Sequence, residues 1–70
     1  MRVVYTDHAE KQIEERKLLK IWVEEAVCYP DYIRREADLY VAIKKLNGIT
    51  LEVVHSREKY IKIVTCYVVK

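Results

Sequence analysis

The fold of this chain is decided by residues 39–55, which read LYVAIKKLNGITLEVVH. On each side of Asn47-Gly48, apolar residues recur at every second position, which is the period that a β-strand shows. Asn-Gly between two such runs is a strong hairpin signal, because a type I′ turn needs a positive φ at both central residues. These residues therefore predict two antiparallel strands joined by a tight turn.

Further strands are predicted on both sides of this hairpin. Residues 2–5 form a short β-rich segment, and residues 32–35 read as another strand. A polar turn at residues 56–59 is followed by a long strand over residues 60–69, which is apolar on both faces as a central strand would be. The hairpin therefore belongs to a larger sheet.

Before Pro30 the apolar residues recur every three or four positions, which is typical of amphipathic helices. A first helix is predicted to begin at a cap formed by Thr6 or Asp7, and Asp7-x-x-Glu10 resembles a capping box. A second helix is predicted from about Lys20 to Tyr29. It ends there because the residue before a proline avoids the helical conformation.

The predicted fold class is therefore α+β, in the order β-α-α-β-β-β-β. Two N-terminal helices are expected to pack on one face of an antiparallel sheet. Seventy residues leave room for one core, so residues 1–70 are predicted to form a single domain.

The composition is that of a globular protein, with 51% hydrophobic and 34% charged residues. The net charge of +2 is unevenly divided, with −1 over residues 1–30 and +3 over residues 31–70. The basic sheet half is compatible with RNA binding, although nucleic-acid surfaces usually carry a stronger excess. Abundant Lys and Glu with few amides and one glycine are typical of proteins from hot environments.

Several classes of site are not expected. Cys28 and Cys66 have neither a metal-ligand spacing nor the density of a disulfide scaffold, so both are predicted to be small buried hydrophobes. No glycine-rich phosphate loop, zinc spacing or carboxylate cluster is present, so we expect no metal and no cofactor. No signal peptide or membrane-spanning apolar run is found, so we expect no membrane partner and a cytoplasmic location.

His8 and Arg16 are the first candidates for chemistry. They lie eight residues apart, on roughly one stripe of the first helix and about 12 Å apart along its axis. A histidine in the first turn lies at the positive end of the helix dipole, which favours the neutral imidazole that a general base needs. Arg16 could clamp a phosphate. The structural alternatives are a His8 that supports the strand–helix junction and an Arg16 that caps the helix or pairs with an acid.

Three polar residues on the predicted strands have structural interpretations. His55 ends a strand on its apolar side and is predicted to be a partly buried edge histidine. Thr65 is typical of a β-branched strand filler, and Tyr67 of a packing residue with its hydroxyl at the rim, although an exposed tyrosine can stack on a base.

The best candidate nucleic-acid surface is basic. Arg34 and Arg35 lie on one predicted strand, and Lys44 lies on the neighbouring strand. These side chains could hold an RNA backbone, although such runs are usually solvated faces.

One longer pattern covers almost the whole chain: His8-Ala9-x-x-Gln12-Ile13-x-x-Arg16-x-Leu18, then Pro30, the hairpin and Val64-Thr65-Cys66-Tyr67. This pattern resembles the small prokaryotic domains catalogued as domain of unknown function 4258. Theirs is similar to His-Ala-x-x-Arg-Met-x-x-Arg-x-Ile, followed by paired strands and a terminal Thr-x-Tyr. Gln12 stands where that family usually has arginine.

The resemblance implies a relation to RelE-like and BrnT-like toxins, which belong to a wider group of metal-independent ribonucleases. It therefore implies a RelE-toxin-like fold and an endoribonuclease of a toxin–antitoxin system, with RNA as substrate and an antitoxin as partner. Carried over by position, it points to His8, Arg16, Thr65 and Tyr67 as catalytic residues.

Two hypotheses follow for the function. In the first, the protein is a toxin-like ribonuclease in which His8 transfers a proton, Arg16 neutralises the phosphorane, and Arg34, Arg35 and Lys44 hold the RNA. In the second, it is a non-catalytic interaction module or a homodimer of the same fold.

Overall fold

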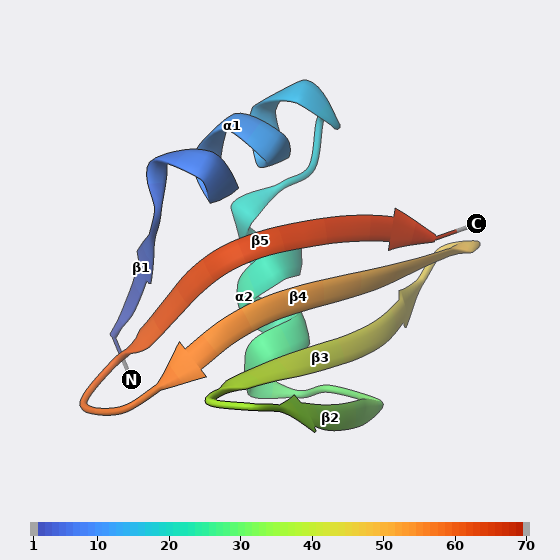
Figure 1. Cartoon of the computed structure of the whole chain (residues 1–70). Coiled ribbons are helices and arrows are strands. Elements are labelled where there is room, and N and C mark those ends of the chain that lie inside the picture. Colours follow the sequence, from blue (N-terminus) through green and yellow to red (C-terminus); the bar gives the residue numbers. More distant parts are fainter. Residues whose placement is uncertain (1, 70) are drawn as a thin grey trace.

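A computed structural model of the chain describes residues 2–69 (Figure 1). It contains two helices, α1 (Asp7–Glu15) and α2 (Lys20–Cys28). The strands are β1 (Val3–Tyr5), β2 (Tyr32–Glu36), β3 (Leu39–Leu46), β4 (Ile49–Arg57) and β5 (Ile61–Val69). The predicted α+β class with two helices is confirmed.

The five strands form one sheet in the order β1-β5-β4-β3-β2. The pairs β2–β3, β3–β4 and β4–β5 are antiparallel, whereas β1 runs parallel to β5. The sheet is therefore mixed, and the prediction of a purely antiparallel sheet is wrong at β1. The reason is that β1 pairs with the last strand, Val3 with Ile61, and no local turn between them reveals the direction of that pairing.

The hairpin turn has the predicted conformation. φ is 43° at Asn47 and 86° at Gly48, so both central residues are in the left-handed region that a type I′ turn requires. This turn sets the register of β3 against β4, in which Leu46 lies opposite Ile49.

A β-bulge interrupts the pairing of β4 with β5. Val54 lies opposite Thr65 and His55 lies opposite Ile63, so Val64 is an extra residue on β5. The bulge shifts the alternation of side chains along β5. Ile63 before it and Cys66 after it both enter the core.

The core lies between the helices and one face of the sheet. Its buried members come from both helices, from the segment between them and from three strands: Ala9, Ile13, Leu18, Val23, Ala26, Val27, Ala42, Leu51, Val53, Ile61, Ile63 and Cys66. Neither α1 nor α2 covers the opposite face of the sheet, which faces the viewer in Figure 1. No helix in the described part of the chain is long and apolar enough to cross a membrane.

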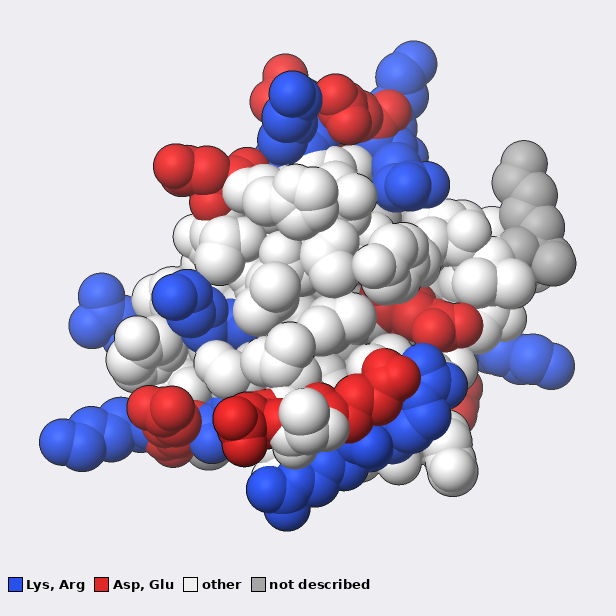
Figure 2. Space-filling view, viewed as in Figure 1, with Lys and Arg blue, Asp and Glu red and all other residues white. Residues whose placement is uncertain are grey.

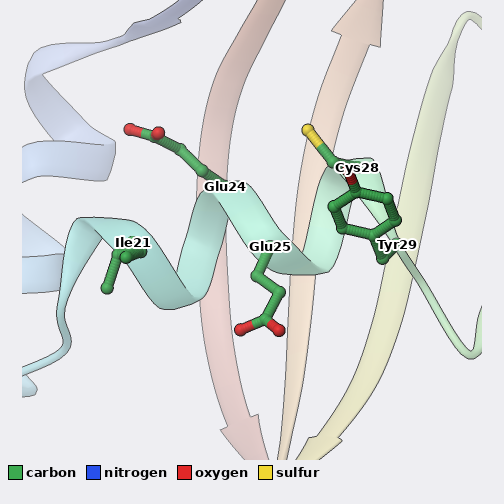
Figure 3. A pocket seen from close by; sticks show the side chains of 5 residues that line it. All are labelled: Ile21, Glu24, Glu25, Cys28 and Tyr29. Atoms are coloured by element: carbon green, nitrogen blue, oxygen red, sulfur yellow. The ribbon is translucent and has the colours of Figure 1, made fainter.

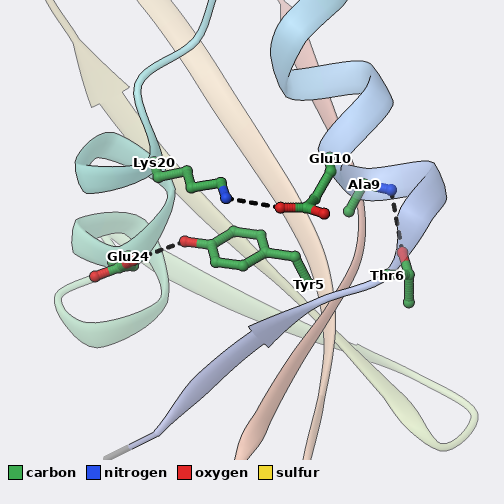
Figure 4. A network of polar contacts seen from close by, with 6 residues as sticks. All are labelled: Tyr5, Thr6, Ala9, Glu10, Lys20 and Glu24. Carbon is green, nitrogen blue, oxygen red and sulfur yellow. Dashed lines mark hydrogen bonds and ion pairs between the residues drawn. The ribbon is translucent and has the colours of Figure 1, made fainter.

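The start of α1 is capped by Thr6, whose Oγ1 accepts a hydrogen bond from the backbone N–H of Ala9 at 3.0 Å. Of the two predicted caps, Asp7 is therefore not the one used. Glu10 does not complete a capping box either, because its carboxylate accepts a hydrogen bond from Lys20 Nζ at 2.7 Å (Figure 4).

Tyr5 joins β1 to α2 beside that ion pair. Its hydroxyl donates a 2.7 Å hydrogen bond to Glu24, and Lys20 Nζ lies 4.7 Å from the centre of its ring (Figure 4). Burial and the Glu24 carboxylate raise the pKa of Tyr5 well above its ordinary value. The two helices and β1 are thus held together by polar contacts as well as by the core.

Candidate functional site

The C-terminal half of β5 has an edge that no strand within residues 2–69 covers, because β1 pairs only with Ile61 to Ile63. Helix α1 lies along this edge and supplies a side chain in place of a strand. Gln12 Oε1 accepts hydrogen bonds from Thr65 Oγ1 at 2.5 Å and from the backbone N–H of Cys66 at 3.2 Å. Gln12 therefore satisfies an N–H group that a missing neighbouring strand would leave unpaired.

Gln12 is the middle of a polar stripe on α1. His8, Gln12 and Arg16 are four residues apart, so they lie on one side of the helix, next to the buried stripe of Ala9 and Ile13. Because Gln12 touches β5, the two ends of this stripe flank the same strand edge.

His8 and Arg16 are exposed. Within residues 2–69, neither side chain takes part in a hydrogen bond or an ion pair. Arg16 is also the C-terminal cap of α1, where its backbone N–H donates to the carbonyl of Gln12 at 2.9 Å and the N–H of Lys17 donates to that of Glu14 at 3.2 Å. Both side chains are thus held at the ends of a fixed helix and remain available to a ligand.

The Arg16 guanidinium acts on β5 electrostatically. Burial raises the pKa of the Cys66 thiol to about 11, and the positive charge of Arg16 opposes part of that rise. Arg16 therefore lies close enough to the edge of β5 for its charge to be felt there, although it contacts no carboxylate among the described residues.

The structure separates the two candidates on β5. Thr65 is buried and its hydroxyl is engaged by Gln12, so it holds α1 in place. Tyr67 is 45% exposed and lies opposite Glu52 in the sheet. Since Cys66 points into the core, Tyr67 beside it points to the face without helices.

The structure does not bring the three basic candidates together on one surface. Arg34 lies on the helix-free face, 3.6 Å from Glu36 and 3.8 Å from Glu52. Its neighbour Arg35 points to the other face of β2. Lys44 donates a 2.8 Å hydrogen bond to the carbonyl of Tyr29, at the end of α2.

Arg35 and three other residues form a cluster that the sequence analysis missed. The Arg35 guanidinium carbon lies 5.5 Å from the centre of the Tyr40 ring, and the Arg57 guanidinium carbon lies 5.8 Å from it. The same ring is stacked 6.1 Å from His55. The two-residue period of the strands could have revealed this cluster. It places Tyr40 on the same face of the sheet as Ala42, and Arg57 on the same face as His55 and Val53.

The prediction of a partly buried edge histidine at position 55 is wrong, because His55 is fully buried in β4. Its Nδ1 lies 3.0 Å from the carbonyl of Val53, and its Nε2 accepts a 2.9 Å hydrogen bond from Arg57 Nε. Arg57 also donates a 2.7 Å hydrogen bond to the carbonyl of Val27. This geometry requires a neutral imidazole with its proton on Nδ1, so His55 anchors Arg57 to α2.

The Gln12 contacts predict a stability effect. Replacing Gln12 by Leu leaves the Cys66 N–H and the Thr65 hydroxyl without an acceptor, and should lower the free energy of unfolding by about 1–3 kcal/mol. Thr65→Val should cost only about 1 kcal/mol, because Gln12 still accepts from Cys66. Urea denaturation measures both, with the exposed Lys11→Leu on the same helix as control. A Gln12→Leu protein as stable as Lys11→Leu would contradict this role.

His55 predicts how stability depends on pH. Burial, the largest cause, lowers the pKa of His55 from 6.5, so the unfolded chain binds a proton more readily than the folded one. The stabilisation is complete above pH 6.5 and is lost as pH falls through the lower folded pKa. Urea denaturation between pH 4.5 and pH 7.5 should show this fall, and His55→Gln should remove most of it. The exposed His8→Gln should keep the wild-type profile; if His8→Gln removes the fall instead, the assignment to His55 is wrong.

Within residues 2–69, no group of three His, Cys, Asp or Glu side chains could hold a metal ion. The comparisons with known proteins give one match. Residues 5–68 match the model of the family described as domain of unknown function (DUF4258). No curated protein and no solved structure showed a significant match. The match spans both helices and nearly the whole sheet, including His8, Gln12, Arg16, Thr65 and Tyr67, and the chain therefore belongs to the DUF4258 family.

Proposed function

We propose that the protein is a metal-independent endoribonuclease of the toxin type, which binds RNA along the seam between α1 and the free edge of β5. The observation that carries this proposal is the stripe of α1. It presents an unengaged imidazole at His8 and an unengaged guanidinium at Arg16, with Gln12 between them bonded to the strand. The two ends lie about 12 Å apart along the helix axis, so a phosphodiester held between them is within joint reach of both side chains.

The proposed reaction uses the 2′-hydroxyl of the RNA as nucleophile. His8 takes the proton of this hydroxyl while its oxygen attacks the adjacent phosphorus. The bond from phosphorus to the 5′-oxygen breaks, and a 2′,3′-cyclic phosphate forms. The leaving 5′-oxygen takes up a proton, from the imidazolium of His8 or from water. Arg16 stabilises the negative charge that develops on the phosphoryl oxygens.

The other two residues to which the family resemblance points, Thr65 and Tyr67, have different roles in the proposed reaction. Thr65 is a positioning residue, because it acts on α1 through Gln12. Tyr67 can stack on a base where the RNA passes onto the helix-free face. Arg34 is the one basic candidate that shares this face with Tyr67.

Cleavage of RNA in EDTA tests the proposal. The products should carry 2′,3′-cyclic or 3′ phosphates. His8→Ala should lower the rate by roughly 10²–10⁴, and Arg16→Lys should restore only part of the activity lost in Arg16→Ala, since an ammonium cannot bind a phosphate in two places.

Lys11→Ala, an exposed charge on another side of α1, is the matched control and should keep the wild-type rate. Melting temperatures of all variants should stay at the wild-type value, because these side chains are exposed and make no hydrogen bond or ion pair within residues 2–69. Intact RNA after incubation with the wild-type protein would refute the ribonuclease.

A second candidate function rests on the helix-free face of the sheet. Figure 2 shows this face, with a broad area free of charged side chains that is bordered by charged side chains. Apolar and aromatic side chains of four strands contribute to this face, namely Tyr32, Ile43, Val54 and Tyr67, and Glu52 lies between Ile43 and Tyr67. An antiparallel sheet that faces water normally alternates apolar with polar residues, so this face is suited to a second copy of the chain.

This candidate predicts a homodimer at about 100 μM in sedimentation equilibrium. Tyr32→Lys, at a residue 61% exposed on this face, should weaken the dimer about tenfold or more because it places a charge in the apolar interface. Tyr29→Lys, at a residue 72% exposed on the helix side, should leave it unchanged. A monomer under these conditions would exclude the homodimer.

A further inference from the structure

The outer faces of the two helices differ in chemistry. The exposed side chains of α1 are almost all charged. By contrast, α2 buries Val23, Ala26 and Val27 against the sheet and also carries apolar side chains on its outer side. Ile21 is 67% exposed, and Tyr29 directly after the helix is 72% exposed. The outer side of α2 therefore combines exposed apolar side chains with the acidic Glu24 and Glu25.

The outer side of α2 forms a shallow apolar depression of about 350 Å³, lined by Ile21, Glu24, Glu25, Cys28 and Tyr29 (Figure 3). The prediction of a buried cysteine is confirmed at Cys66 and is wrong at Cys28, which is exposed at the end of α2. Ile21 and Cys28 are seven residues apart and mark two turns of one stripe. A stripe of this length matches the contact that one helix makes with another across two turns.

The charge around the depression is negative. Glu25 is exposed, and Glu24 accepts only the hydroxyl of Tyr5 among the described residues. Two lysines near the ends of α2 have acidic partners elsewhere. Lys20 forms an ion pair with Glu10, and Lys44, which donates a hydrogen bond to the carbonyl of Tyr29, lies 4.0 Å from the Asp31 carboxylate. A complementary partner must therefore bring positive charge.

We infer that the outer face of α2 docks a helical segment of another protein, with one apolar stripe flanked by lysine or arginine. The apolar side chains of the segment would cover Ile21, Cys28 and Tyr29, and its cations would pair with Glu24 and Glu25. This inference does not depend on the ribonuclease activity, because the depression involves no residue of the α1 stripe.

A second copy of this chain does not fit this face. Two α2 helices related by a twofold axis would place the Glu24 and Glu25 carboxylates of both copies next to one another across the axis. Repulsion between like charges at such a short distance opposes association. RNA is repelled from the same face for the same reason, so the occupant is a basic protein segment.

The test uses two synthetic peptides as probes. One is a 14-residue amphipathic helix of leucine and lysine, and the other has glutamate in place of every lysine. Each is titrated into ¹⁵N-labelled protein at two salt concentrations. The leucine–lysine peptide should shift the amides of Ile21, Glu25 and Cys28 saturably, more weakly at high salt. The leucine–glutamate peptide should not shift them.

Two pairs of variants distinguish binding at this site from nonspecific binding of the peptide. Ile21→Ser removes the apolar anchor, and Val69→Ser removes an exposed apolar side chain from the sheet. Glu25→Lys reverses a charge at the site, and Glu14→Lys makes the same change on α1. The first member of each pair should weaken binding of the leucine–lysine peptide by about fivefold or more, and the second by less than about twofold.

Three results would overturn the inference. The first is that the leucine–lysine peptide shifts the helix-free face of the sheet instead of α2. The second is that Glu14→Lys weakens binding as much as Glu25→Lys. The third is that the protein self-associates and Ile21→Ser abolishes this, since the occupant would then be a second copy. Loss of RNA cleavage in the separate assay would leave this site unaffected.

Discussion

The structure depends on how the outer edge of β5 is satisfied. This edge receives three kinds of partner in succession along its length. The strand β1 pairs with Ile61 to Ile63, then the backbone N–H of Thr6 donates to the carbonyl of Ile63 at 3.1 Å and the Thr6 hydroxyl donates to that of Val64 at 3.1 Å. Beyond the bulge, the Gln12 side chain accepts a hydrogen bond from the backbone N–H of Cys66. From Ile61 to Cys66 this strand edge is thus satisfied by a strand, a helix cap and a helix side chain, and these three contacts fix where α1 lies.

The bulge at Val64 explains why the site and the core meet on this strand. Without the extra residue, strict alternation would carry Cys66 to the face opposite Ile63. With it, Ile63 and Cys66 both lie beneath the helices, and Thr65 comes to lie at the edge, where Gln12 reaches it. The same hydrogen bonds that complete the backbone therefore orient the stripe of His8 and Arg16. This coupling makes Thr65 a structural residue whose loss would still be felt by the proposed chemistry.

The parts of the fold that were predictable are those governed by local residue patterns. Asn47-Gly48, the capping residue ahead of α1 and the end of α2 before Pro30 each follow from the conformational preferences of one or two residues. The parallel pairing of β1, the bulge and the burial of His55 depend on residues far apart in the chain, and no local preference encodes them. The candidate site divides in the same way. The helical period predicted that His8 and Arg16 share a stripe, whereas the Gln12–Thr65 contact joins residues 53 positions apart.

The distribution of charge differs between the surfaces to which ligands could bind. The first thirty residues carry a net charge of −1 and the remainder +3, and the fold places the first group largely in the helical layer and the second in the sheet. A polyanion is therefore attracted to the sheet side and to Arg16 at the end of α1, and is opposed by the carboxylates along the rest of α1 and on the outer face of α2. Because these regions lie on different parts of the domain, an RNA at the α1 stripe and a basic segment on α2 would not compete for the same side chains.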